Sequence, residues 1–434
     1  MPNGKLTFVH LSDIHFVKGF SGESSFDLDG AVRSALIADA KKLRAELEPL
    51  SGILITGDIA FAGKSSEYHT ALDWLAELAD VLGCQREYMW CVPGNHDVDQ
   101  SVLKENTAIG AVHQELRRAR RLDDEIKTHL ENQNTGSLLF SPLKAYNDEF
   151  AARLDCLTRP KQPWWTYDFR LNDRSILRLR GLNSAFCSGL HDDLKENKLI
   201  VGSAQTEYGK QEGVEYLTLC HHPISWLIDG DSTRQALLAY SRIQLFGHKH
   251  VQEANRIDES LWLTAGAVHP ERSDSGWLPR YNYLSISVEG RGKDRVMSVD
   301  LYARAWHHPD RQFTREQGIQ DGNSRNYKLK LPAWSPQMIS EQHNIDGRSD
   351  SPPNQASDNL KSDMNLNKKK LLFKFIGLPH HTKVAIMRKF ELWEESDQHK
   401  PDTDIFVACF ERANQKGVLD AVWNEVDGLS GQQL

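Results

Sequence analysis

The sequence has no apolar run long enough to span a bilayer, no Cys-x-x-Cys pair and no excess of positive charge. A transmembrane helix needs about 20 apolar residues, so we expect a protein that does not enter the membrane. The six cysteines are scattered through apolar runs, and no signal segment precedes the first strand, which favours a reduced cytoplasm. The net charge of −8 argues against holding polyanions by bulk electrostatics, without excluding a local basic groove.

The composition is that of a globular protein, with 39% hydrophobic and 26% charged residues among 434. It changes at residues 335–367, where Ser, Asp, Asn, Pro, Gln and Gly dominate, and this segment is predicted to be a flexible linker. We therefore expect a large domain over residues 1–334 and a small one over residues 368–434. In the small domain, apolar residues recur at helical spacing, which predicts about four short helices. The expected class is α/β with an all-α module.

Short apolar runs alternate with amphipathic stretches at the start of the chain. Residues 5–10, 53–55 and 88–92 are typical of strands, and residues 31–47 and 65–82 of helices. Strand, helix, strand, helix, strand in this order predicts right-handed crossovers and a largely parallel sheet. In such a sheet, ligands bind beyond the carboxyl ends of the strands.

The middle of the chain is predicted to contain a helical insert and a second sheet. The insert covers residues 101–163, and its loops are expected to set specificity. Its basic run, residues 117–121, predicts a solvated helix face or, alternatively, the border of a phosphate-bearing substrate. The later predicted elements are strands 164–171, 175–182, 214–220 and 243–246, helices 203–212 and 234–240, then antiparallel strands 261–265, 281–288 and 295–302, with 327–331 as one more.

Polar clusters follow five of the apolar runs. They are Asp13-Ile14-His15, Gly57-Asp58, Gly94-Asn95-His96-Asp97, His221-His222-Pro223 and Gly247-His248-Lys249-His250. Any one of these could be an ordinary polar strand end, but five in series are hard to attribute to loop composition. In an extended segment, residues two apart face the same side, so Asp13 and His15 should converge. The same spacing relates His248 to His250.

The chemistry of these side chains indicates metal binding. The candidate ligands are Asp13, His15, Asp58, Asn95, His221, His248 and His250. Carboxylate, amide and imidazole donors together suit Mn²⁺, Fe²⁺, Zn²⁺ or Ni²⁺ better than Ca²⁺, which prefers oxygen. Two such ions about 3.5–4 Å apart can lower the pKa of a bound water and clamp an in-line displacement at phosphorus. The sequence therefore predicts phosphoester hydrolysis at a dinuclear centre.

In this order the five clusters resemble the signature of the calcineurin-like metallophosphoesterase superfamily, over about residues 6–250. The resemblance implies a β-sandwich flanked by helices. It implies that one metal is held by Asp13, His15 and His250, the other by Asn95, His221 and His248, and that Asp58 bridges them. His96 would protonate the leaving oxygen or steady the phosphate charge, and Asp97 would orient His96. The family's ligand is the histidine two residues before proline, which favours His221 over His222.

Two motifs narrow the range of expected substrates. Residues 57–61 and 94–97 read Gly-Asp-Ile-Ala-Phe and Gly-Asn-His-Asp, whereas the Ser/Thr protein phosphatases of the superfamily carry G-D-x-V-D-R-G and G-N-H-E. This difference argues against a protein phosphatase. The pattern is similar both to cyclic-nucleotide phosphodiesterases and to the repair nucleases, and the motifs do not separate them. The expected substrate is a phosphodiester, which leaves open a cyclic nucleotide, DNA, RNA or another diester.

The C-terminal module resembles, through residues 373–390 and 410–426, small helical adaptor domains fused to effector enzymes in bacterial conflict and signalling systems. This resemblance implies a protein partner bound through residues 368–434. The alternative is a generic helical bundle. For the whole chain, a different class of function is a scaffold in which the module does the work and the phosphoesterase domain only binds.

Overall fold

The computed structural model describes residues 4–17, 29–192, 198–270, 278–316, 324–336, 368–397 and 402–430. The chain divides into two compact units. One comprises Met1–Glu149 and Cys156–Ile339, and the other Phe150–Asp155 and Ser340–Leu434. Most of the predicted linker lies outside the described residues, so its flexibility and the domain boundaries stay predictions.

The first sheet begins with three parallel strands whose residues are all buried, β1 (Leu6–Leu11), β2 (Leu50–Thr56) and β3 (Met89–Val92). Burial on both faces explains why these strands read as continuous apolar runs. Helices α1 (Gly30–Glu46) and α2 (Ser65–Leu82) connect them, as predicted. The sheet order is β12-β11-β10-β1-β2-β3, and β13 also pairs with β11. The added strands are antiparallel: β10 (Arg280–Glu289), β11 (Val296–His307), β12 (Gln312–Arg315) and β13 (Arg325–Lys330).

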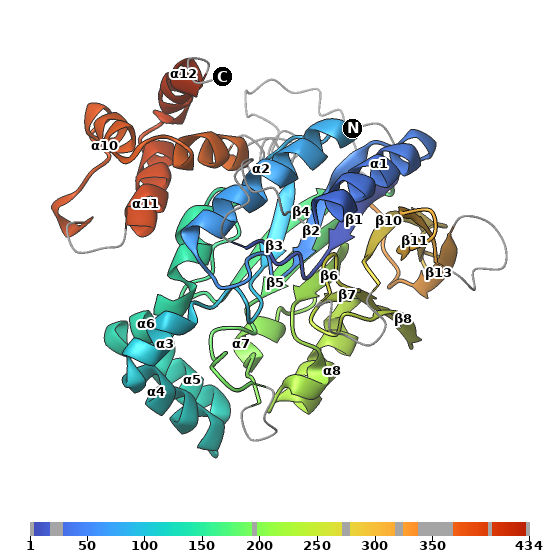
Figure 1. Cartoon of the computed structure of the whole chain (residues 1–434), viewed down its shortest axis with the longest axis horizontal. Helices are drawn as coiled ribbons and strands as arrows, with labels where there is room; N and C mark the ends of the chain where they lie inside the picture. Colours follow the sequence, from blue (N-terminus) through green and yellow to red (C-terminus); the bar gives the residue numbers. More distant parts are fainter. Residues whose placement is uncertain are drawn as a thin grey trace, which may run out of the picture. The chain divides into compact units, whose positions relative to one another are not determined.

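The second sheet has the order β4-β5-β6-β7-β9-β8. Its strands are β4 (Trp164–Arg170), β5 (Ile176–Leu182), β6 (Val214–Cys220), β7 (Ser241–Phe246), β8 (Gln252–Ile257) and β9 (Ser260–Ala265). The four central strands run parallel and the two outer strands run antiparallel to their neighbours. Helices α7 (Ser203–Thr206) and α8 (Gly230–Tyr240) belong to its crossovers (Figure 1).

One prediction for this region was wrong. Residues 261–265 and 281–288 do not succeed each other as antiparallel neighbours, because β9 pairs in parallel with β7 while β10 lies in the first sheet. On its other side β9 pairs with β8, which was not predicted. β8 is an edge strand without a buried residue, so no apolar run marks it in the sequence. The predicted helix 203–212 is also shorter and ends at Thr206.

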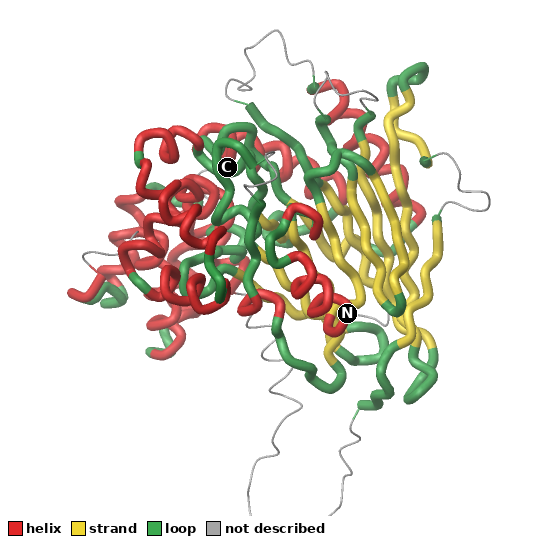
Figure 2. Tube along the Cα trace, turned by 90° about the horizontal axis from the view of Figure 1, so that it is seen from below, coloured by secondary structure: helices red, strands yellow, loops and turns green. Residues whose placement is uncertain are grey.

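Aromatic rings join the two sheets, whose strands run side by side in the Cα trace of Figure 2. Trp90 of β3 packs against two rings of β4, with centroids 4.7 Å from Tyr167 and 5.0 Å from Phe169. Phe8 of β1 lies 5.2 Å from the ring of Phe169. Burying large rings of this kind contributes roughly 2–3 kcal/mol each. The result is the predicted sandwich of two mixed sheets flanked by helices.

The helical insert follows β3. It contains α3 (Gln100–Glu105), α4 (Thr107–Arg118), α5 (Leu122–Glu131) and α6 (Gln133–Phe140). These helices pack on the loop that follows β5 through an apolar cluster that includes Val112, Leu116, Ile126, Phe140 and Phe186. The insert therefore rests on a segment that leaves the second sheet at the end of β5.

The described part of the C-terminal region contains four α-helices, as predicted. They span residues 368–376, α10 (His380–Lys389), α11 (Asp402–Gln415) and α12 (Leu419–Ser430). Phe375 is fully buried, and its ring lies 5.4 Å from Phe406 and 4.9 Å from Phe410. Arg412 also forms an ion pair with the buried Asp397. An apolar core and a buried ion pair thus help to hold these helices together.

Two further observations concern the cysteines and the lengths of the helices. All six cysteines are buried and free. In the part of the chain that the structure describes, every helix is too short or too polar to cross a membrane.

Candidate metal centre

The seven predicted ligands lie together, on the loops that follow β1, β2, β3, β6 and β7. Donor atoms of Asp13, Asp58 and His221 lie within 4.8 Å of one another, although these residues come from three different strands and both sheets. The loops are tied to each other by their backbones, since the amide of Asp13 donates to the carbonyl of Gly57 (3.1 Å) and the amide of Gly247 to that of His221 (3.0 Å). The ends of both sheets therefore form one site.

The backbone at the site differs from the prediction. Five ligand residues have positive φ, between 52° and 69°: Asp13, His15, Asp58, His248 and His250. Residues spaced two apart converge here because both adopt the left-handed conformation in a turn, not because the segment is extended. Such a conformation is uncommon outside glycine and clusters at functional sites, where the surrounding structure stabilises it. The turn at His15 is held by its amide, which donates to the carbonyl of Asp58 (3.0 Å).

The first donor group contains Asp13, His15 and His250. The Nε2 of His250 lies 3.4 Å from Oδ1 of Asp13, which is fully buried. The Nδ1 of His15 donates to the carbonyl of His269 (3.3 Å), so that Nε2 faces the site. This group joins the second one through the backbone, because the amide of His248 donates to Oδ2 of Asp13 (3.1 Å).

The second donor group surrounds the side-chain oxygen of Asn95. This Oδ1 lies 3.2 Å from Nε2 of His221, 3.1 Å from Nδ1 of His248 and 3.2 Å from Nε2 of His222. The Nδ1 of His221 donates to the carbonyl of Thr56 (2.7 Å), which leaves Nε2 directed at the site. Three ring nitrogens and one amide oxygen thus point into the same space.

Asp58 lies between the two groups. Its Oδ2 is 3.4 Å from Nε2 of His15 and 3.2 Å from Nε2 of His221, while its Oδ1 accepts from the amide of His96 (2.8 Å). Burial alone would raise the pKa of the Asp58 carboxyl, but His221 and His15 hold that pKa well below its ordinary value. Gly94 is packed so closely here that a Cβ at this position would collide with Oδ1 of Asp58.

These residues fit divalent cations. Bonds of about 2.1 Å to one ion place neighbouring donor atoms roughly 3 Å apart, close to the 3.1–3.4 Å separations within each group. Burial lowers the pKa of His221, yet Asp58 and Asp13 raise that pKa to about 9. The buried carboxylates therefore attract positive charge to the position where the two groups meet. Nitrogen and oxygen donors in this mixture suit transition-metal ions.

The predicted catalytic pair is arranged differently from the expectation. The Nδ1 of His96 donates to the carbonyl of Phe61 (2.9 Å), and it is this carbonyl, not Asp97, that orients the ring. The Asp97 carboxylate accepts instead from the amides of Gly94 (2.9 Å) and Ala60 (3.0 Å) and from the hydroxyl of Tyr68 (3.0 Å). Burial and the charge of Asp58 raise the pKa of Asp97 to about 7. Asp97 thus holds the loops after β2 and β3 together.

His222, which was not predicted to be a ligand, lies at the site, and sequence reasoning missed two aromatic rings there. His222 belongs to the second donor group, and its Nδ1 pairs with the hydroxyl of Ser184 (2.8 Å). The ring of Trp226 lies 4.1 Å from that of His248, and the ring of Phe61, 44% exposed, lies 5.3 Å from that of His96. His222 is adjacent to a predicted ligand, which was a usable signal. The two aromatic residues carried none, because single aromatics in loops are common.

Comparison with known families agrees with this geometry. The chain belongs to the calcineurin-like phosphoesterase family, whose model matches residues 6–252. The family generally binds divalent metals. A second model, that of the GTPase-associated adaptor domain, matches residues 367–428. No curated protein matches the sequence.

Similar solved structures share little sequence with this chain. Vacuolar Protein Sorting 29 from Cryptosporidium parvum is 10% identical, with a TM-score of 0.34, over 76% of this chain and 100% of that one. A 5′-nucleotidase described as putative, from Staphylococcus aureus, is 11% identical, with a TM-score of 0.34, over 78% of this chain and 56% of that one. A predicted phosphoesterase from Streptococcus pneumoniae is 11% identical, with a TM-score of 0.29, over 75% of this chain and 98% of that one. Because these scores are low, the family assignment rests on the model match and the side-chain geometry.

Proposed function

We propose that this protein is a metal-dependent phosphodiesterase with two divalent ions in its centre. The observation that carries the proposal is the position of Asp58, whose Oδ2 lies within 3.4 Å of one histidine from each donor group. A carboxylate in this position can bridge two cations. Asp13, His15 and His250 would hold one ion, and Asn95, His221 and His248 the other. Mn²⁺, Fe²⁺, Zn²⁺ and Ni²⁺ all suit these donors.

When bound, two such ions would lower the pKa of a water molecule and stabilise negative charge at phosphorus. The protein's own acid would be His96. Because its Nδ1–H is engaged by the Phe61 carbonyl, Nε2 is the nitrogen that takes up and gives a proton. That nitrogen would protonate the leaving oxygen as its bond to phosphorus breaks. His222 would steady the Asn95 amide, which its Nε2 faces at 3.2 Å.

Two aromatic rings support a diester as substrate. Phe61 packs beside His15 and His96, on the side of the first donor group. Trp226 packs against His248 and His222, which belong to the second. A phosphate held between the groups therefore has an apolar ring on either side, as two organic substituents would require. Net charge of −8 favours a small diester such as a cyclic nucleotide, and a nuclease acting on DNA or RNA is the alternative.

The C-terminal unit would bind a protein partner, which the match to an adaptor domain supports. We further place the protein in a reducing cytoplasm, since all six thiols are free.

The test is hydrolysis of bis-p-nitrophenyl phosphate by the full-length protein, loaded with Mn²⁺ and then treated with a chelator. We expect turnover that the chelator abolishes and that returned metal restores. A panel of cyclic nucleotides, single- and double-stranded DNA, RNA and phosphomonoesters would then define the substrate. Well-folded protein without metal-dependent turnover, across several divalent ions, would favour the scaffold function instead.

A further inference from the structure

Large exposed apolar side chains gather on the loops of the metal centre. Among the described residues, those more than a third exposed are Phe61, Leu190, Ile228 and Val251. All of these except Leu190 lie on the loops that follow β2, β6 and β7, which also carry candidate ligands. A single apolar residue on a surface needs no explanation, whereas several around one site indicate contact with a ligand.

Phe61 is the aromatic member of this group, and its backbone is fixed on both sides. Its amide donates to the carbonyl of Phe16 (3.0 Å), and its carbonyl accepts from Nδ1 of His96 (2.9 Å). Ala60, the preceding residue, also forms a parallel bridge with Phe16. The backbone of Phe61 therefore has little freedom left to lose when the ring contacts a ligand, and this favours binding.

The exposed ring lies beside the proposed acid. Its centroid is 5.3 Å from that of the His96 ring and 6.1 Å from that of the His15 ring. Because Nδ1 of His96 is engaged by the Phe61 carbonyl, Nε2 is the nitrogen that faces the leaving oxygen. An acid protonates an oxygen within about 2.6–3.2 Å of it. The leaving alcohol therefore begins at the neighbour of Phe61, and a substituent of one ring reaches from there to the phenyl group.

The second aromatic ring of the site flanks the other donor group. Trp226 lies 4.1 Å from the ring of His248 and 6.2 Å from that of His222, and both histidines belong to the second group. A diester has two substituents, and the two rings lie beside different donor groups. Phe61, which neighbours the acid, is the ring that belongs to the leaving substituent.

We propose that Phe61 determines specificity for the leaving group, by stacking on a flat aromatic or heterocyclic ring that the departing alcohol carries. The substrates are then diesters whose leaving alcohol bears such a ring, as the nucleoside does in a cyclic nucleotide. Aromatic side chains stack on every nucleobase, so the contact selects a class of leaving group and not one base. This inference rests on the proposed phosphodiesterase function.

The experiment compares two methyl diesters that differ only in the leaving group. Methyl p-nitrophenyl phosphate releases a flat ring, and methyl trifluoroethyl phosphate releases an aliphatic alcohol; the methyl phosphate formed is measured for both. In the full-length protein loaded with Mn²⁺, Phe61→Ala should lower kcat/KM for the p-nitrophenyl ester about tenfold, mainly through KM, because a stacking contact is lost. The trifluoroethyl ester should change less than about twofold. Phe61→Tyr keeps the ring and should stay within about twofold of the wild type for both esters.

A third ester tests the side on which Phe61 acts. The p-nitrophenyl ester of thymidine 5′-phosphate has the same leaving group, but its retained group is a nucleoside instead of methyl. Phe61→Ala should lower kcat/KM for this ester by the same factor as for the methyl ester. A clearly larger loss would place the ring at the retained group and overturn the proposal.

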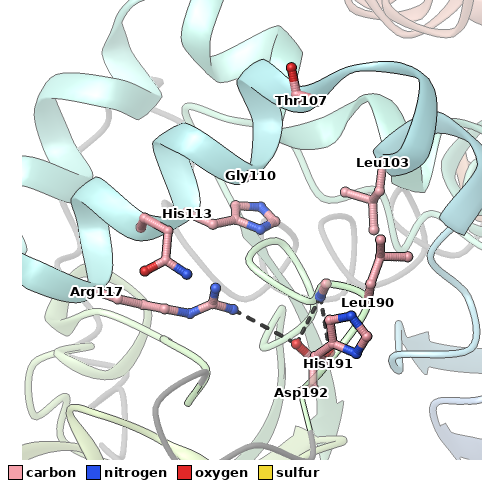
Figure 3. Close-up of a pocket in the computed structure, with 10 residues that line it drawn as sticks. Leu103, Thr107, Gly110, His113, Arg117, Leu190, His191 and Asp192 are labelled. Carbon is pink, nitrogen blue, oxygen red and sulfur yellow. Dashed lines mark hydrogen bonds and ion pairs between the residues drawn. The ribbon is translucent and has the colours of Figure 1, made fainter.

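The matched control is Leu190→Ala, which also removes an exposed apolar side chain. Leu190 is 39% exposed and lies beside α4, on the loop after β5, which carries none of the candidate ligands (Figure 3). This variant should hydrolyse all three esters like the wild type. Metal content, measured by elemental analysis, should equal that of the wild type in every variant, and loss of metal from Phe61→Ala would overturn the proposal.

The pattern of losses separates recognition of the leaving group from other roles. If Phe61 only positioned His96, the trifluoroethyl ester would lose most, because its poorer leaving group needs protonation more, and the proposal would be wrong. Equal losses for the two methyl esters, or no loss for either, would refute this inference alone. A wild-type protein without metal-dependent turnover of any ester would refute the proposed function and this inference with it.

Discussion

In the metal centre, five residues have left-handed backbone and two fully or almost fully buried carboxylates face histidines. In the described part of the C-terminal helices, by contrast, Glu391 alone among non-glycine residues has positive φ, and aromatic rings such as Phe375 and Phe406 fill the core. The first region concentrates buried charge and unusual backbone, which lower stability unless the surroundings support them. In the second, the buried ion pair between Arg412 and Asp397 lies in a core filled mostly by apolar side chains. The difference indicates that the first was shaped by a ligand and the second by packing.

The largest effect should follow from removing the shared carboxylate. Asp58→Asn would take away the negative charge that serves both donor groups, and turnover should fall by at least about 10³-fold together with loss of bound metal. Metal content by elemental analysis and hydrolysis of bis-p-nitrophenyl phosphate measure the two losses. The control is Asp300→Asn. It removes a carboxylate on β11 that pairs with Lys5, and it should leave metal content and turnover unchanged. Two tightly retained metals in Asp58→Asn would contradict the bridging assignment.

A smaller effect should separate catalysis from metal binding within the same site. His96→Ala should keep its metal but lose rate by about 10² to 10⁴, because it removes the proposed acid and no ligand. The loss should be smaller for a substrate with a better leaving group, which needs less protonation. If the variant loses metal instead, His96 is a ligand.

The helical unit should respond only in stability. Phe375→Ala deletes a fully buried ring and should lower the free energy of unfolding by about 3–5 kcal/mol, measured by denaturant titration followed by circular dichroism. Metal-dependent turnover should stay within about twofold, since no candidate ligand lies in this unit. Phe390→Ala, at a half-buried position, should cost less. A large loss of turnover in Phe375→Ala would show that the two regions are coupled.

The smallest effect on the melting temperature should come from the chelator, and it should be confined to one region. Each bound ion at about 100 times its dissociation constant stabilises the folded state by about 2.7 kcal/mol, so two ions contribute about 5.4 kcal/mol. Their removal should lower the melting temperature of the phosphoesterase unit by about 5–10 °C and leave the transition of the helical unit unchanged. Scanning calorimetry with and without chelator measures both. Equal shifts in the two transitions would mean that they are not independent.

The sequence could predict that the candidate ligands lie together, because parallel strands bring their carboxyl ends to one edge of a sheet, where Asp13, Asp58 and Asn95 follow apolar runs. It could not predict their backbone. The left-handed turns depend on hydrogen bonds between loops far apart in the chain, such as the one from Asp13 to Gly57. The role of Asp97 was missed for the same reason, because the amides that it binds belong partly to the loop after β2.

Pairing between strands was also beyond local patterns. The run 261–265 has the same apolar character whether it joins one sheet or the other, and its parallel pairing with β7 is fixed by tertiary structure. The basic run that begins at the end of α4 is a third feature that the local pattern did not predict fully. The basic run at 117–121 predicted a solvated face, which holds for Arg121, 85% exposed, while Arg117 is turned inward to Asp192.

Gly94 has a practical consequence. Because a single methyl group there would push against the oxygen of Asp58, an alanine at this position would disable the centre while every donor residue stays in the chain. Such an inert copy would still present its C-terminal helices. It could be used to capture whatever those helices recognise, with no turnover to consume a substrate during the capture.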